Sequence, residues 1–570
     1  MFRITSLRGA LRKRFVTSTP NADKFKSVYP LFLKHQKSPV IITAHAEHIR
    51  EMNSRYPLIE PFLYANIVWD DQKHELVYKV IEPILSEQDK QIIKDITSDL
   101  MELLDVELSS ITKKEEAVKY LEDHVKKVIA DAGLNVPTHK YAKIFYYIYR
   151  NFIGLNEIEP FMNDPRIEDI GCDGIGVPVY IIHRVFGSVK TNVKFDNAEN
   201  LRDFVVKMAE RCGRYISYAE PILDGSLPDG SRVHASLSSD VTTHGPTFSI
   251  RKFREDPFSP VDTIGVGTAS PELMSYLWVA VEHGSSILLC GGVATGKTSL
   301  LNCLSMFIKP EQKIITIEDT RELSLPHENW IPSVSRSGFG IPTESGEKYG
   351  EVSLFDLLKG SFRQNPDYVI VGEVRGQEAY VMFQGMASGH PSMTTMHADS
   401  IEGVIRRLIT PPISLPPSLI ESLDMIIVLT HAREIGKSAR RISEIDEIES
   451  MDTVTGKVHF LKSYAWDPIS DTYLKKDESV LLRRLGTKLG VTFETLEKDV
   501  KERERVINWM IAKKVNKFED VSNMINLYYR DRPTLMDWIE KNMEPYSTIS
   551  KEEIKNLKST PAGITVLGEK

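Results

Sequence analysis

The chain has 570 residues, so it is too long for a single domain and is expected to form three or four. Hydrophobic residues make up 41% and charged residues 26% of it, as in an ordinary globular protein that buries large cores. The formal net charge of −8 argues against a general nucleic-acid binder, although it leaves local basic patches open.

The cysteines Cys172, Cys212, Cys290 and Cys303 lie far apart and form no CxxC pair. That spacing excludes a zinc ribbon and fits a reducing cytosolic compartment. No apolar run approaches the roughly 18–20 residues that cross a bilayer, so no membrane-spanning segment is expected.

Residues 1–24 form a basic amino-terminal tail, which contains Arg3, Arg8, Arg12, Lys13 and Arg14 before the first acid at Asp23. The tail lacks the apolar core of a secretory signal. A solvated tail is the simplest interpretation. The alternatives are docking on an anionic membrane face or a membrane partner, and an organellar transit peptide.

Residues 25–135 are predicted to form a mainly helical amino-terminal domain. Short strands are expected in "FLYANIVWDDQKHELVYKVIEP", where apolar and polar residues alternate around a polar turn. The segment "SEQDKQIIKDITSDLMELLDVEL" has helical apolar spacing, with Ser86 as the candidate N-cap. Gly133 and Pro137 then interrupt the helical pattern and indicate a domain boundary.

Residues 136–255 combine a helix, short strands and the polar loop "DGSLPDGSRVHASL", which predicts an α+β domain. Three prolines and two glycines in "REDPFSPVDTIGVGTASP" indicate an interdomain linker at 256–269. Between 270 and 462, apolar strands alternate with helical segments, a pattern typical of a parallel α/β sheet. From 463 to 570 a helical carboxyl-terminal extension with a loose tail is expected.

A phosphate-binding loop is the strongest motif, because Gly291, Gly296, Lys297 and Thr298 fit G-x-x-x-x-G-K-[ST] between a strand and a helix. Glycines let the loop backbone point its N–H groups at phosphate oxygens, and the helix adds its positive end. Lys297 is expected to reach the β- and γ-phosphates. The predicted nucleotide-binding residues are Gly291, Gly292, Val293, Ala294, Thr295, Gly296, Lys297, Thr298 and Ser299. The sequence therefore predicts binding of a nucleoside triphosphate; a purely structural turn is the alternative.

Three polar strand ends follow this loop along the chain. Glu318 and Asp319 end "KIITIED", Glu373 follows "DYVIVG", and His397 follows "PSMTTM". In many P-loop enzymes the second of these strands ends in an aspartate that helps to hold Mg²⁺, but Gly372 occupies that place here. Ligands of α/β sheets gather at the carboxyl ends of the strands, so we expect the three strand ends to face one crevice.

The segments "GGVATGKTSLLN", "TIEDTREL", "RQNPDYVIVGEVRG" and "SGHPSMTTMHADS" resemble, in order, the Walker A, Asp, Walker B and His boxes of the secretion ATPase superfamily. That superfamily drives type II secretion, type IV pili, conjugative type IV secretion and the archaellum. Upstream, "YAEPILDGSLPDGSRVHASL" and "GPTFSIRKF" resemble its nucleotide-contacting domain, and "YPLIEPFLYANIVW" resembles the archaeal pilus and archaellum motors. The resemblance covers roughly residues 56–466.

The resemblance implies an α/β fold with a RecA-like P-loop NTPase core built on a parallel sheet. An α+β, PAS-like nucleotide-contacting domain and a mainly helical domain would precede this core, and the helical extension would follow it. It also implies a division of roles among the acids, because Gly-Glu is the ordinary Walker B ending of the family. Glu373 would hold Mg²⁺ through a water, together with Thr298. Glu318 would orient or deprotonate the attacking water, with Asp319 and Glu322 as second choices.

The resemblance further places His397 near the γ-phosphate, where it would couple hydrolysis to movement. Arg232 and Arg251 match the family arginines that reach ATP from the amino-terminal domain, although each has a simpler alternative as a salt bridge. Closing a cleft between these arginines and Lys297 would complete the site and turn chemistry into domain rotation. Arg254 is a neighbouring candidate, Arg363 and Arg375 are candidates for subunit or domain contacts, and His390 is the second histidine of the His box.

The family likeness predicts a hexameric motor ATPase that uses ATP and Mg²⁺ on the cytoplasmic face of the membrane. It would assemble a type IV pilus-like filament or archaellum through a polytopic membrane platform protein, which the amino-terminal region and the helical extension would contact. The alternatives are a conjugative or type II protein-secretion ATPase and a low-activity ATP-binding scaffold. A nucleic-acid translocase is disfavoured, because the sequence has no basic, aromatic binding stripe.

Overall fold

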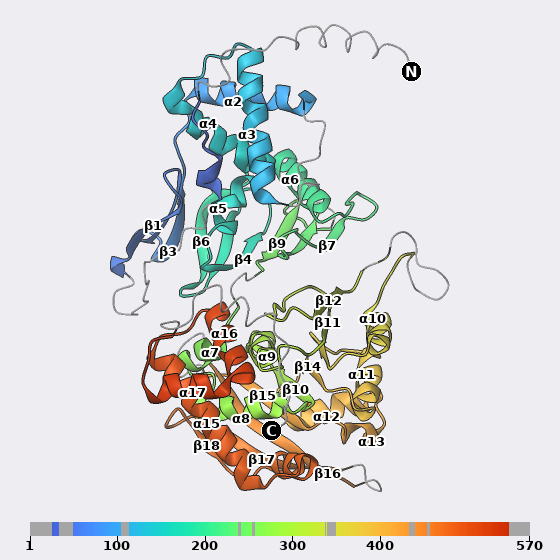
Figure 1. The fold of residues 1–570 in the computed structure, drawn as a ribbon. Coiled ribbons are helices and arrows are strands. Elements are labelled where there is room, and N and C mark those ends of the chain that lie inside the picture. The colour runs from blue at the N-terminus through green and yellow to red at the C-terminus, as the bar shows by residue number, and fades with distance from the viewer. Residues whose placement is uncertain are drawn as a thin grey trace, which may run out of the picture. The chain divides into compact units, whose positions relative to one another are not determined.

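The computed structural model describes residues 25–33, 50–103, 113–237, 241–253, 257–336, 338, 349–432, 439–452 and 457–545. The chain divides into an amino-terminal unit, Met1–Phe253, and a carboxyl-terminal unit, Arg254–Lys570. Each unit contains one nine-stranded sheet (Figure 1). The basic tail at 1–24, Arg254 and the end of the chain after 545 lie outside the described residues.

The sheet of the amino-terminal unit has the order β1-β2-β3-β6-β5-β4-β9-β8-β7. Neighbouring strands are antiparallel except β3 and β6, which pair in parallel through Val77–Lys190 and Tyr78–Thr191. The strands are β1 Asn53–Ile59, β2 Leu63–Asp70, β3 Glu75–Ile81, β4 Ile167–Cys172, β5 Pro178–His183, β6 Gly187–Lys194, β7 Ile222–Ser226, β8 Arg232–Ser236 and β9 Thr247–Arg251.

The pairing of β3 with β6 changes the predicted organisation of this half of the chain. The hairpin strands expected within 25–135 are present, but they extend the sheet of residues 136–255 and share one hydrophobic core with it. Residues 25–253 therefore form one compact unit, where the sequence had suggested two domains. The physical reason is that a short meander cannot cover its own apolar face and open edge, which the neighbouring sheet and helices supply.

Helices of the amino-terminal unit are α2 Glu87–Leu103, α3 Lys114–Asp131, α4 Thr138–Phe152, α5 Glu159–Met162 and α6 Ala198–Arg211, with short 3₁₀ turns at Tyr29–Phe32 and Asn156–Ile158. Ser86 caps α2 as expected, because its hydroxyl accepts the Asp89 N–H while Asp89 accepts the Ser86 N–H. Buried Glu122 of α3 accepts the backbone N–H groups of Val28 and Tyr29 at 2.9 and 3.0 Å, which fixes the segment before β1.

The sheet of the carboxyl-terminal unit has the order β12-β11-β13-β14-β10-β15-β16-β17-β18. The pairs from β12 to β15 are parallel, which confirms the predicted parallel α/β sheet, and the pairs from β15 to β18 are antiparallel. The strands are β10 Ile287–Gly291, β11 Ile314–Glu318, β12 Trp330–Val334, β13 Tyr368–Val371, β14 Ser392–Met396, β15 Met425–His431, β16 Arg440–Met451, β17 Val458–Asp467 and β18 Thr472–Lys475.

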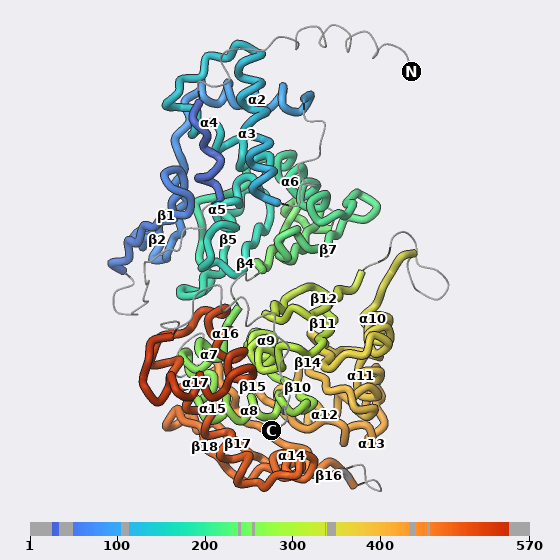
Figure 2. The backbone as a smooth tube through the Cα atoms, viewed as in Figure 1, coloured from blue at the N-terminus to red at the C-terminus, as the bar shows by residue number. Residues whose placement is uncertain are grey.

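Helices cover both faces of this sheet, as the burial of its parallel strands requires. Ile287 and Leu289 of β10 pack with α7–α9 and α14–α17, whereas Leu288 packs with α10–α13 on the opposite face. The carboxyl-terminal helices return to the start of the unit, where α15 packs on α8 (Figure 2). The helices are α7 Pro260–Gly265, α8 Pro271–Glu282, α9 Lys297–Ser305, α10 Leu354–Ser361, α11 Glu378–Ala387, α12 Ile401–Ile409, α13 Pro417–Ile420, α14 Val480–Leu489, α15 Phe493–Ala512, α16 Phe518–Arg530 and α17 Arg532–Glu540.

Two predicted segments have more structure than their composition suggested. The extension expected to be helical from 463 first completes β17 and adds β18, and its helices begin at Val480. The linker at 256–269 contains helix α7, which starts at a reciprocal capping box of Ser259 and Asp262. Gly267, just after α7, lies against the guanidinium of buried Arg441. No described helix combines the length and the apolar character needed to span a membrane.

Candidate nucleotide-binding site

The phosphate loop joins the buried strand β10 to helix α9, as the motif predicted. Gly296 has a φ of +92°, a conformation that favours glycine. A side chain at Gly291 would come within 2.5 Å of the Leu429 carbonyl oxygen. The Thr295 hydroxyl donates to the Gly292 carbonyl at 3.0 Å and braces the turn. The two motif glycines are thus required by backbone conformation at one end and by strand packing at the other.

Lys297 lies over this loop, with only 7% of the residue exposed. Its Nζ donates to the carbonyl oxygens of Gly291 at 3.0 Å and Gly292 at 2.7 Å. Burial lowers the pKa of Lys297, and the nearby Glu373 carboxylate acts in the opposite direction. The ammonium group is therefore held at the loop, where an anion would restore its lost solvation.

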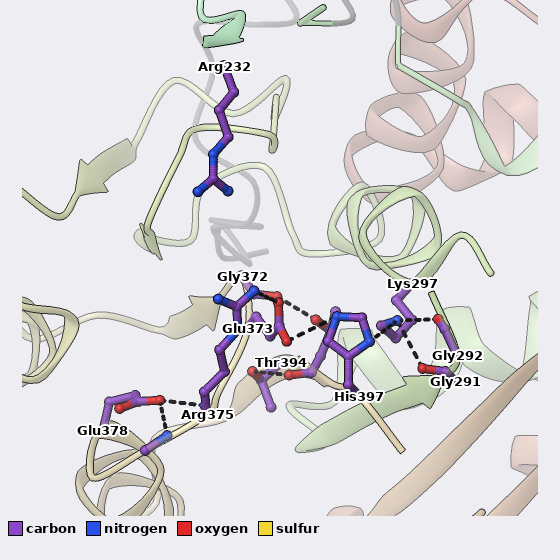
Figure 3. A network of polar contacts seen from close by, with 12 residues as sticks. Arg232, Gly291, Gly292, Lys297, Gly372, Glu373, Arg375, Glu378, Thr394 and His397 are labelled. Atoms are coloured by element: carbon purple, nitrogen blue, oxygen red, sulfur yellow. Dashed lines mark hydrogen bonds and ion pairs between the residues drawn. The ribbon is translucent and has the colours of Figure 1, made fainter. Parts of the chain in front are cut away.

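A chain of polar contacts runs from Lys297 across the ends of two neighbouring strands (Figure 3). Lys297 Nζ lies 3.2 Å from His397 Nδ1, just beyond β14, and His397 Nε2 lies 3.3 Å from Glu373 Oε1, beyond β13. Arg375 Nη2 closes the chain on Glu373 Oε2 at 2.6 Å. An ammonium group can only donate, so Nδ1 accepts and the neutral ring carries its proton on Nε2, facing Glu373. Burial favours this neutral ring by lowering the pKa of His397, against the pull of Glu373.

Glu318 ends strand β11 and is only 3% exposed. Its Oε1 accepts the backbone N–H groups of Glu322 at 2.9 Å and Leu323 at 3.0 Å, which fixes the carboxylate in place. Its Oε2 is buried and has no hydrogen-bond partner among the described residues. Burial raises the pKa of Glu318 to about 7, although the two backbone N–H groups oppose the shift. A carboxylate with one free oxygen and a pKa near neutrality is suited to accept a proton from water.

Gly372 explains why the expected aspartate is missing from the end of β13. A Cβ atom at Gly372 would lie 3.1 Å from Cγ of Glu318 on the adjacent strand β11. The carbonyl oxygen of Gly372 accepts the Thr395 hydroxyl of β14 at 2.7 Å, which fixes the backbone there. Glycine therefore makes room for Glu318, and the first carboxylate of this strand end moves one residue on to Glu373.

The other predicted residues of the loop and the acidic strand end are more open to solvent. Thr298 is half-buried in the first turn of α9, and Val293, Ala294 and Ser299 are exposed. Asp319 is exposed and accepts the Ser335 hydroxyl at 3.1 Å. Glu322 is exposed, and its backbone rather than its side chain contacts Glu318. Among the acids of this strand end, Glu318 thus has the contacts and burial that a catalytic base needs.

Two further candidates lie near the amino ends of the parallel strands, opposite the phosphate loop. Arg363 belongs to the 3₁₀ turn before β13, and His390 precedes β14. The phosphate loop, Glu318, Glu373 and His397 all follow their strands, so the amino ends of β13 and β14 lie away from them. His390 instead packs edge-on against the Phe362 ring, with centroids 5.1 Å apart. A structural role fits His390, whereas Arg363 is exposed.

Two contacts at the site have no counterpart among the predicted residues. Glu378 Oε1 accepts the backbone N–H groups of Arg375 at 2.6 Å and Gly376 at 2.7 Å, which fixes the turn after Glu373. The acid in the first turn of α11 was the available signal. His431 Nε2 lies 3.1 Å from the Val293 carbonyl oxygen in the phosphate loop. No motif pointed to His431, because it ends an otherwise apolar strand.

In the amino-terminal unit, Arg232 and Arg251 are directly paired across strands β8 and β9. Neither side chain is buried in the core; each contacts one acid, Arg232 with Asp224 at 3.1 Å and Arg251 with Asp169 at 3.3 Å. Like charges directly opposite each other in a sheet are unfavourable. Asp224 and Asp169 offset this repulsion by pairing with one arginine each.

The model of the family described as "Type II/IV secretion system protein" matches residues 179–483, more than half of the chain. The chain belongs to this family. The match confirms the predicted likeness to the secretion ATPases and spans Arg232, Lys297, Glu318, Glu373 and His397. The fold is the α/β fold with a P-loop and a parallel sheet that the likeness implied.

Similar proteins cover different parts of this secretion-family chain. MJ0900 of Methanocaldococcus jannaschii is 33% identical over 508 residues, which are 88% of this chain and 89% of that protein. The type IV secretion system protein PtlH of Bordetella pertussis is 32% identical over 275 residues, covering 43% of this chain and 79% of PtlH. The solved structure of the VirB11 ATPase from the Brucella suis type IV secretion system is 25% identical with a TM-score of 0.26, covering 52% of this chain and 94% of VirB11.

Proposed function

We propose that this chain is a motor ATPase that hydrolyses ATP to drive assembly of a type IV pilus-like filament or archaellum. It would act as a hexamer on the cytoplasmic face of the membrane, through a polytopic platform protein. The observation that carries the proposal is the contact chain from Lys297 through His397 and Glu373 to Arg375. These contacts link the phosphate loop to the ends of two strands, so a change of nucleotide at the loop can move both strand ends.

ATP would bind with its phosphates over the loop of 291–299, where Lys297 exchanges the Gly291 and Gly292 carbonyls for phosphate oxygens. The Thr298 hydroxyl and the Glu373 carboxylate are hard oxygen ligands of the kind that suits Mg²⁺. Bound Mg²⁺ would supply charge neutralisation at the β- and γ-phosphates. Glu373 would meet the ion through water, because its carboxylate also contacts His397 and Arg375.

Glu318 would take the proton from the attacking water at its unpaired Oε2. Metal holding and water activation then fall to two carboxylates on neighbouring strands. The side chains of Arg232 and Arg251 would add positive charge to the transition state from the amino-terminal unit. His397 stands between Lys297 and Glu373, so loss of the γ-phosphate would change its contacts and signal turnover to both strand ends.

The relative MJ0900 of Methanocaldococcus jannaschii matches 88% of the chain, so the likeness extends into the amino-terminal unit and fits an archaeal branch of the family. A protein-secretion ATPase is the second candidate, favoured by the likeness to PtlH, which is named for a type IV secretion system. A low-activity scaffold is disfavoured, since a scaffold has no need for a buried carboxylate with one free oxygen at the carboxyl end of β11.

Phosphate release by the purified chain tests the activity. Glu373→Gln should reduce turnover about 100-fold or more, because the metal contact and the link to His397 are both lost. Glu519→Gln, an exposed carboxylate of α16, is the matched control and should leave turnover unchanged. Unchanged turnover in Glu373→Gln would contradict the assigned mechanism.

The assembly state and the partner need separate measurements. Light scattering should give a molar mass six times that of one chain when a non-hydrolysable ATP analogue is bound. The same measurement without the analogue shows whether assembly depends on the nucleotide. Turnover should rise with lipid vesicles that carry a platform protein and stay constant with single-stranded DNA. Stimulation by DNA alone would instead favour a nucleic-acid translocase.

A further inference from the structure

The strand order separates the two ends of a nucleotide bound at the phosphate loop. Strand β10, which leads into the loop, lies between β14 and β15. The groups proposed to act on the γ-phosphate, Glu318, Glu373 and His397, come from β11, β13 and β14, all on the β14 side. The nucleoside end of the ligand would therefore point toward the β15–β16 side, to which no role has been assigned so far.

Two basic residues of the β15–β16 pair flank the loop on that side. His431 and Arg440 are cross-strand partners at the end of the pair. His431 Nε2 contacts the Val293 carbonyl oxygen at 3.1 Å, near the start of the loop. Arg440 lies beside its end, because a Cβ atom at Gly296 would meet Arg440 Cδ at 3.2 Å and Nη1 at 3.9 Å.

The guanidinium of Arg440 lacks the partners that its neighbour has. Arg441 is 4% exposed and makes a bidentate pair with Asp471, with both N–O distances at 2.8 Å. Arg440 Nε is buried without a hydrogen-bond partner, and within the described ranges no carboxylate forms an ion pair with Arg440. A guanidinium that no carboxylate holds in place keeps its planar faces for other contacts, while the buried Nε–H would need an acceptor that lies in the plane of the group.

We propose that Arg440 packs its guanidinium plane against the base of the bound nucleotide and sets the affinity for the nucleoside part. The inference rests on the proposed ATP-binding function. A planar guanidinium stacks on aromatic rings, which an ammonium does not do equally well. His431 acts as a positioning residue, because it holds the loop backbone at Val293 and lies opposite Arg440 in the strand pair.

Calorimetric titration of the full chain with Mg-ADP and with Mg-tripolyphosphate separates base contacts from phosphate contacts. Arg440→Ala should weaken ADP binding about 10-fold and change tripolyphosphate binding less than about twofold, because tripolyphosphate has no base. In turnover assays the KM for ATP should rise by a similar factor with kcat unchanged, as expected when binding is lost equally in the ground and transition states.

Arg483→Ala, on α14, is the control, since Arg483 is exposed and its side chain contacts Glu478 and the Phe493 ring, away from the phosphate loop; it should change neither affinity. Arg440→Lys keeps the charge and the aliphatic stem, and should weaken ADP binding less than Arg440→Ala does. Equal losses for ADP and tripolyphosphate would overturn the proposal in favour of a phosphate or loop-supporting role. Unchanged ADP binding in Arg440→Ala would also overturn it. A wild-type chain that binds neither ligand would overturn the proposed function as well.

Discussion

Strand β13 of the carboxyl-terminal unit is buried at all four positions, whereas residues of β9 in the amino-terminal unit alternate between the core and the surface. Helices cover both faces of the sheet in the carboxyl-terminal unit, so polar groups reach the ligand only from the ends of its strands. In the sheet of the amino-terminal unit, Arg232 begins β8 and Arg251 ends β9, so the two arginines lie opposite each other at one end of this strand pair. The proposed chemistry thus uses strand ends in both units, but the strand in the carboxyl-terminal unit is buried on both faces, whereas β9 leaves one face open to solvent.

Removing the two paired arginines of β8 and β9 is expected to have the largest effect. Arg232→Ala combined with Arg251→Ala should lower kcat about 10³–10⁵-fold if they supply transition-state charge, with little change in ADP affinity. Lys194→Ala, a basic residue of β6 in the same sheet that pairs with Asp196, is the control. A loss of less than about tenfold in kcat would show that the two arginines form only surface ion pairs.

Glu318→Gln tests the proposed base at the carboxyl end of β11, because it keeps the shape of the side chain and removes its basicity. We expect kcat to fall about 10²–10⁴-fold, with ADP binding retained because Glu318 is assigned to the water rather than to the nucleotide. His390→Ala, the control, changes the amino end of β14, away from the proposed site, and should retain full turnover. Normal kcat in Glu318→Gln would transfer the role of base to Asp319 or Glu322.

The pH dependence of turnover tests whether Glu318 acts as the base. Burial raises the pKa of Glu318 to about 7, and only its carboxylate form accepts a proton. The rate should therefore rise about 10-fold between pH 6 and pH 8, as the deprotonated fraction rises, and this rise should be missing in the residual activity of Glu318→Gln. A pH-independent kcat in the wild-type chain would contradict the assignment.

The same shift has a consequence for folding. The folded chain holds the Glu318 proton more tightly than the unfolded chain, whose ordinary pKa is 4.5. The stability from this group is therefore complete below pH 4.5 and is lost as pH rises through about 7. Denaturant titrations of Glu318→Gln should lack this contribution.

The smallest expected effect concerns the contact between two neighbouring strand ends. Gly372→Ala places a methyl group 3.1 Å from Cγ of Glu318, so the carboxylate must shift. We expect about a fivefold loss in kcat, corresponding to roughly 1 kcal/mol of overpacking. Gly360→Ala is the matched control, because a Cβ there meets nothing within 4 Å. Equal behaviour of the two variants would show that Glu318 does not depend on Gly372.

The sequence was sufficient for the parts of the fold that rest on local patterns. The parallel sheet, the phosphate loop and the polar ends of three strands follow from apolar runs and from the G-x-x-x-x-G-K-T spacing. The joining of β3 to β6 could not be predicted, since it pairs residues more than 100 positions apart through side chains with no distinctive pattern. For the same reason His431 and Arg440 escaped notice until their strand pair placed them beside the loop.

The helix within the predicted linker has a practical consequence. Arg441 Nη1 donates to the Val266 carbonyl oxygen, and the Tyr473 hydroxyl donates to the Gly267 carbonyl oxygen, both at 3.1 Å. These contacts tie the turn after α7 to β16 and β18, so residues 260–268 move with the sheet of the carboxyl-terminal unit. The Val266 side chain is 55% exposed, which makes Val266 an attachment point for a spectroscopic probe. A label there would report the position of the sheet of the carboxyl-terminal unit when ATP is added.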